Sequence, residues 1–128
     1  MPVTTKNNEE EHPMWRYLME LGLDEKQKAS AKEIKSIVMK ETVKKRADVH
    51  IAEIELKDML DKDPVDIKAV EMKLNQIEAV KTEILLLFIV AMEEVKSRLT
   101  AEQRKRFKEI SETNYLVGFP LRYGMMHE

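Results

Sequence analysis

The chain has 128 residues, of which 36% are charged, 43% hydrophobic and 5% aromatic. This composition is too apolar for a disordered chain and is typical of one domain built from long, solvated helices. The 22 basic and 24 acidic residues give a net charge of −2, so no overall field favours nucleic acid or an anionic membrane. The chain contains no cysteine. Disulfides, thiolate metal sites and a thiol nucleophile are therefore excluded.

Residues 1–11 contain no apolar stretch and no cleavage pattern, so we expect no signal peptide in the chain as it stands. This leaves two alternatives, a cytoplasmic protein or the mature form of a protein whose leader has been removed. The longest apolar run covers residues 84–92. It is too short to cross a bilayer, which takes about 20 residues.

Helix breakers are rare, and between Leu23 and Val117 the only strong one is Pro64. Strands need frequent turn residues, so this distribution predicts an all-α protein. Pro13 favours a first helix that runs to about Leu21 and stops at Gly22. Asp24 and the glutamine three residues later form a capping box that starts a second helix, over residues 25–61.

Asp63 and Pro64 are expected to cap and begin the third helix, with the proline at its first position. Thr100 and Gln103 form a second capping box, so a fourth helix should cover residues 101–113. Residues 1–128 are treated as a single helical domain, in which 1–11 and 117–128 are expected to be flexible tails.

The second and third helices would each be about 50 Å long, whereas a compact globule of this chain length has a radius of gyration of about 14 Å. This mismatch predicts a long antiparallel helical hairpin and an elongated molecule. Residues 84–92 are apolar on all sides of the third helix, which favours a dimer that covers them. We expect the dimer seam to contain Ile84, Leu87, Phe88 and Met92.

Apolar residues at steps of three and four predict the buried faces of both long helices. On the second helix these are Ile34, Val38, Ala47, Ile51 and Ile54. On the third they are Ile67, Val70, Leu74, Ile77, Ile84, Phe88, Ala91, Val95 and Leu99.

The candidate metal ligands are the three histidines and two residues near them, Glu53 and Met14. His50 and Glu53 share a helix face, and the terminal residues His12, Met14 and His127 could supply soft ligands for copper(I). Ordinary surface histidines and core methionines explain the same residues. No P-loop, dinucleotide-binding glycine motif, GxSxG or HExxH sequence is present. We therefore do not expect an enzyme or a required cofactor.

The two capping boxes also carry a family resemblance. Leu-Asp-Glu-Lys-Gln at 23–27 and Leu-Thr-Ala-Glu-Gln at 99–103, separated by the hairpin that turns at Asp63-Pro64, resemble the repeated Leu-Thr-x-x-Gln motif of the Spy/CpxP family. In the first copy, Asp24 replaces the usual threonine. The resemblance implies a bacterial periplasmic protein with four helices per protomer and a curved antiparallel dimer.

The resemblance also implies one of two activities. The first is that of an ATP-independent holdase chaperone linked to envelope stress, with unfolded proteins and a membrane sensor protein as partners. The second is heavy-metal sensing or resistance, with zinc, nickel or copper bound. The histidine positions of the metal sensors correspond here to Met14, Leu18 and Ala91, so that site is not carried over.

The resemblance thus favours a holdase with a concave, basic and apolar client surface. The residues expected on that surface are Ile34, Val38, Lys40, Lys44, Lys45, Arg46, Arg104, Arg106 and Phe107. A metal-binding sensor is the alternative function, and a structural module with one dominant partner is a third.

Overall fold

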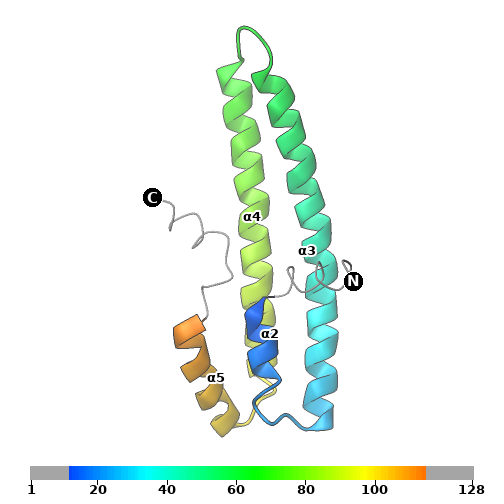
Figure 1. The fold of residues 1–128 in the computed structure, drawn as a ribbon, viewed down its shortest axis with the longest axis vertical. Helices are drawn as coiled ribbons and strands as arrows, with labels where there is room; N and C mark the ends of the chain where they lie inside the picture. Colours follow the sequence, from blue (N-terminus) through cyan, green and yellow to red (C-terminus); the bar gives the residue numbers. More distant parts are fainter. Residues whose placement is uncertain (1–11, 115–128) are drawn as a thin grey trace, which may run out of the picture. The chain divides into compact units, whose positions relative to one another are not determined.

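The computed structural model describes residues 12–114, with side chains described up to residue 111. Within this range there are four α-helices and no strand (Figure 1). The helices are α2 (Pro13–Leu18), α3 (Glu25–Leu60), α4 (Ile67–Lys96) and α5 (Ala101–Asn114). The predicted all-α class with four helices is confirmed. The predicted tails, 1–11 and 117–128, lie outside the described residues.

Helix α2 starts where the sequence predicts but ends three residues early, at Leu18 instead of Leu21. Pro13 occupies its first turn, and the His12 Nδ1 atom accepts a hydrogen bond of 3.1 Å from the Met14 backbone N–H. Gly22 lies beyond the helix with φ of +72°. That left-handed conformation favours glycine, because in other residues the Cβ atom would lie too close to the following backbone carbonyl oxygen.

Helix α4 begins later than predicted. The sequence suggests that Pro64 is the first helical residue, but the helix starts at Ile67. The Asp66 side chain is the cap, since its Oδ1 atom accepts a 3.1 Å hydrogen bond from the Ala69 N–H. Pro64 instead lies in the preceding turn, where its bond to Asp63 is cis.

The chain divides into two compact units, and each contains part of α3 and part of α4. Unit 1 comprises the residues up to Met39 and those from Ala91 onward, and unit 2 comprises residues 40–90. In unit 1, α2 packs against α5. The fully buried side chains of unit 1 are large and flexible or aliphatic: Met14, Leu18 and Met92.

Unit 2 is a two-helix packing with a small core. Val49 and Ala52 of α3 pack with Ile77 of α4, and the half-buried Leu56 and Val80 lie against them. Such a short contact buries little apolar surface, so unit 2 has a thin core for its length.

Two ion pairs join α3 to α4 within unit 2. The Lys45 Nζ atom lies 3.0 Å from Glu83 Oε1, and Lys73 Nζ lies 2.7 Å from Glu55 Oε1. Glu55 lies ten residues after Lys45 on α3, whereas its partner Lys73 lies ten residues before Glu83 on α4. The two helix segments of unit 2 therefore run antiparallel.

The buried face of α3 in unit 2 differs from the prediction. Ile51 and Ile54 were expected in the core but are 54% and 50% exposed, and Ala47 is exposed as well. The core uses Val49 and Ala52 instead. Both sets of residues are apolar, and contact with α4 decides between them.

Parts of the predicted α4 stripe also lie at the surface. Ile67 is 72% exposed and Leu74 is 47% exposed, whereas Ile77 and Phe88 are buried as expected. Ile67 is the first helical residue, so it has no preceding turn to pack with. The stripe is thus buried over the second half of α4 more completely than over the first.

Candidate functional site

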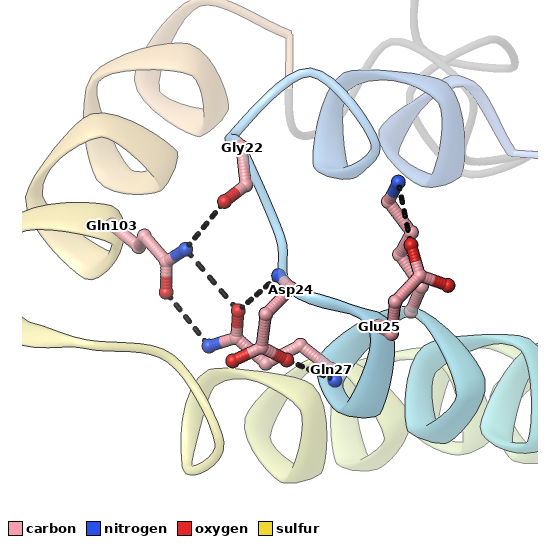
Figure 2. Close-up of polar contacts among 6 residues, drawn as sticks. Gly22, Asp24, Glu25, Gln27 and Gln103 are labelled. Atoms are coloured by element: carbon pink, nitrogen blue, oxygen red, sulfur yellow. Dashed lines mark hydrogen bonds and ion pairs between the residues drawn. The ribbon is translucent and has the colours of Figure 1, made fainter.

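In unit 1, the glutamines of the two capping boxes, Gln27 and Gln103, lie against each other (Figure 2). At the start of α3, Gln27 N–H donates to Asp24 Oδ1 at 2.8 Å, and Asp24 N–H donates to Gln27 Oε1 at 2.9 Å. At the start of α5, Gln103 N–H donates to Thr100 Oγ1 at 3.1 Å, and Thr100 N–H donates to Gln103 Oε1 at 2.9 Å. Both capping boxes predicted from the sequence are confirmed.

The two glutamines also bond to each other. Gln27 Nε2 donates to Gln103 Oε1 at 2.8 Å, and Gln103 Nε2 donates to Gln27 Oε1 at 3.3 Å. Each Nε2 atom donates a second bond to a backbone carbonyl two residues before the other cap. Gln27 donates to the oxygen of Arg98, and Gln103 donates to the oxygen of Gly22, at 2.9 and 3.3 Å.

We call this arrangement of Gln27 and Gln103 the glutamine clasp. Each amide oxygen accepts two hydrogen bonds and each amide nitrogen donates two, which uses all the bonding capacity of a carboxamide. No donor or acceptor is left over for a ligand. The clasp therefore holds the start of α3 to the start of α5 and is not itself a binding site.

Three residues predicted on the client surface lie in the protein interior. Ile34 is 6% exposed, Val38 is 8% and Phe107 is 2%. They cannot contact a client, and this part of the prediction is wrong. On α5, Phe107 is buried although the basic residues on either side of it in the sequence are exposed.

The basic members of the predicted client surface lie at or near the surface. Lys40, Lys44 and Arg46 on α3 are exposed. Arg104 and Arg106 on α5 are also exposed, and Arg104 Nη1 donates to the Leu99 carbonyl at 2.9 Å. Lys40, Lys44 and Arg46 belong to unit 2, whereas Arg104 and Arg106 belong to unit 1.

Lys45 is the one predicted client residue whose charge is engaged across the helices. Its hydrogen bond to Glu83 raises the pKa of Lys45 above its ordinary value of 10.5, and nearby Glu41 and Asp48 act in the same direction. A lysine with a raised pKa keeps its charge at neutral pH. Lys45 therefore links α3 to α4 instead of facing a partner.

Of the four residues predicted in the dimer seam, two are buried within a single chain and two are half-buried. Met92 is completely buried and Phe88 is 7% exposed, so both are covered by the chain itself. Ile84 and Leu87 are half-buried.

The described members of the predicted metal-ligand set are divided between the two units, with His12 and Met14 in unit 1 and His50 and Glu53 in unit 2. Met14 is fully buried and His12 caps α2, whereas His50 and Glu53 lie exposed on α3. His127 lies outside the described residues. Within residues 12–114, no three histidine, cysteine, aspartate or glutamate side chains are grouped so that they could hold a metal ion.

Sequence reasoning missed the main surface feature, which is a set of large apolar side chains open to solvent. Eleven such residues are exposed in the described part of the chain, and all but Ile37 belong to unit 2. On α3 they include Val43, Ile51 and Ile54. On α4 they include Met72, Leu86, Ile89 and Val90.

Several exposed apolar residues of α4 share one side of the helix, and Ile67 and Leu74 lie elsewhere on it. Met72, Ala79 and Leu86 are spaced by seven residues, about two turns, and Val90 lies one further turn away. Their exposed fractions are 66% for Met72, 57% for Leu86 and 56% for Val90. Together with Ile89, which is 36% exposed, we call these residues the α4 patch. The spacing of seven was the sequence signal that could have revealed it.

Comparisons of the chain with protein-family models, with curated proteins and with solved structures give no match. Among the described helices, none combines the length and the apolar character needed to cross a membrane. Membership of the Spy/CpxP family therefore stays a prediction that rests on the two capping boxes.

Proposed function

We propose that the protein is an ATP-independent holdase chaperone of the Spy/CpxP type, which binds apolar segments of unfolded proteins on the α4 patch. The observation that carries this proposal is the exposure of Leu86 and Val90, with Met72 about four turns away on the same side of α4, in a chain that is otherwise rich in charge. Exposed apolar patches that are rimmed by polar residues mark interaction sites on many proteins.

The chemistry of the α4 patch fits an unfolded chain better than a folded partner. Its large side chains alternate with charged residues such as Glu83 along the helix, so an extended polypeptide can touch it at several separate points. The flexible thioether of Met72 adapts to side chains of different shapes. Such binding needs neither a nucleotide nor an active site.

The predicted full-length hairpin, the curved dimer and the periplasmic location belong to this proposal. The antiparallel ion pairs of unit 2 support the hairpin over residues 40–90. The metal-sensor alternative has no comparable support, because Met14 is buried and the pair of His50 and Glu53 provides only two candidate ligands.

The proposal is tested by light scattering from a chemically denatured client diluted into buffer without ATP. We expect an equimolar amount of the protein to suppress aggregation. The double variant Leu86→Gln with Val90→Gln should lose most of this effect because it makes the α4 patch polar. Ile37→Gln is the matched control, since Ile37 is 56% exposed but lies in unit 1. Unchanged scattering at a several-fold excess of the wild-type protein would refute the proposal.

A further inference from the structure

The methionines in the described part of the chain differ widely in exposure. Met14 and Met92 are completely buried, whereas Met72, on α4 in unit 2, is 66% exposed. The others within residues 12–111 are half-buried: Met19, Met39 and Met59. A reagent in solution therefore reaches the thioether of Met72 directly. It reaches the thioethers of Met14 and Met92 only when the packed core opens.

Met72 supplies the apolar surface at one end of the α4 patch. The residues one turn before and one turn after it on the same side of the helix are Lys68 and Gln76, and both are polar and exposed. The next large apolar member of the patch is Leu86, about 21 Å further along α4. This end of the patch is therefore apolar only as long as the Met72 side chain is apolar.

We propose that Met72 is a site of reversible oxidation by hydrogen peroxide, and that its oxidation weakens the binding of clients. This role of Met72 depends on the holdase function proposed above. In the reaction, the Met72 sulfur takes one oxygen atom from peroxide as the O–O bond breaks, and the products are methionine sulfoxide and water. The sulfur loses two electrons and the peroxide gains them.

Oxidation of Met72 changes the α4 patch without disturbing the core. A sulfoxide is polar and accepts hydrogen bonds from water, so an apolar client segment that packs on it must remove that water. Met72 lies outside the core cluster of unit 2, and the helices therefore lose no packing when it is oxidised. The same change at Met14 or Met92 would place a polar group in the closed core of unit 1 and destabilise it.

The exposure of Met72 also allows the oxidation to be reversed. A methionine sulfoxide reductase has to take the oxidised side chain into its own active site, and a side chain on the open side of a helix is accessible to it. In this reduction a dithiol becomes a disulfide, and the sulfoxide oxygen leaves as water. Client binding is thus lost while peroxide is present and is recovered when the reductase acts.

Peptide mapping by mass spectrometry, after brief treatment of the whole chain with hydrogen peroxide, tests the selectivity of oxidation. We expect Met72 to gain one oxygen atom at least about tenfold faster than Met14 and Met92, because the buried pair reacts only through opening of the core. Mapping by peptide also separates these residues from the methionines near the two ends of the chain. Equal rates at Met72 and Met92 would overturn this proposal and leave the holdase proposal standing.

Light scattering from a denatured client tests the consequence for binding. Catalase removes the peroxide before the client is added, so that only the protein itself is oxidised. We expect the oxidised protein to be needed at about tenfold higher concentration for half-suppression of aggregation. Methionine sulfoxide reductase with dithiothreitol should restore the original concentration. Complete oxidation of Met72 without any change in suppression would overturn the proposal.

Substitutions separate Met72 from the other methionines. Each variant is compared with itself before and after peroxide. Met72→Leu removes the sulfur and keeps a large apolar side chain, so peroxide should leave its activity unchanged. Met39→Leu, at a half-buried methionine of unit 1, is the matched control and should stay as sensitive as the wild type. Met72→Gln makes the position polar, and we expect weak suppression of aggregation even without peroxide.

Two results distinguish a failure of this proposal from a failure of the holdase proposal. A Met72→Leu variant that peroxide still inactivates would show that another methionine is responsible, and only the role of Met72 would be overturned. An untreated wild-type protein that suppresses no aggregation would overturn the holdase function and, with it, the control of that function by Met72.

Discussion

The two units differ in how their helices are joined. In unit 1, two neutral glutamine side chains link the starts of α3 and α5 through four hydrogen bonds, beside a core that includes the fully buried Met14, Leu18 and Met92. In unit 2, the cross-links are ion pairs of partly exposed side chains, and the core is small. Exposed ion pairs contribute little to stability. Unit 1 therefore has the features of a stable scaffold, and unit 2 has those of a binding surface.

The largest expected effect on stability concerns two nearby positions on α4, one in each unit. Met92→Ala removes a side chain that is 0% exposed in unit 1, and we expect it to lower the free energy of unfolding by about 2–5 kcal/mol. Val90→Ala, two residues away in unit 2 at 56% exposure, should change it by less than about 0.5 kcal/mol. Urea titrations followed by circular dichroism measure both. Equal losses would show that unit 2 is as tightly packed as unit 1.

An intermediate effect is expected at the glutamine clasp. Gln27→Ala and Gln103→Ala should each lower the free energy of unfolding by about 1–2 kcal/mol, because each leaves carbonyl and amide groups without partners. A double-mutant cycle should give a coupling energy of about 0.5–3 kcal/mol. Gln76→Ala, on the exposed surface of unit 2, serves as the control. A coupling energy of zero would mean that the two capping boxes act independently.

The smallest effect concerns the ion pair between Lys45 and Glu83 in unit 2. The pKa of Lys45 is raised in the folded protein, so its stabilising contribution is fully present below pH 10.5, the ordinary lysine value, and is lost as the pH rises through the raised value. Thermal unfolding should therefore show a slight extra loss of stability above pH 10.5. Glu83→Gln should remove that extra loss, and a wild-type curve identical to that of Glu83→Gln would contradict the assignment.

Local signals in the sequence were reliable guides to the fold. The two capping boxes depend on residues three apart, so they could be read directly and placed the starts of α3 and α5 correctly. The start of α4 was harder to predict because two aspartates, Asp63 and Asp66, both suit a cap. Only the geometry of the turn shows that Asp66 is used.

The surface could not be read from the sequence because both long helices are apolar on more than one side. On α3, Ile51 and Val49 are equally suitable for a core, and packing against α4 buries only Val49. On α4, residues 84–92 look uniformly apolar, yet Phe88 turns inward and Leu86 outward. The periodicity of apolar residues identifies the candidate buried faces of a helix. Which face is buried depends on the other helix that packs against it, and that helix is distant in the sequence.

The glutamine clasp restricts which residues can occupy its two positions during evolution. In an ordinary capping box, glutamate serves as well as glutamine, because only its side-chain oxygen is needed. Here Gln27 and Gln103 must each accept and donate at once, and a glutamate carboxylate has no hydrogen to donate. Relatives that keep this junction should therefore carry glutamine at both positions, and a change at one should be accompanied by a change at the other.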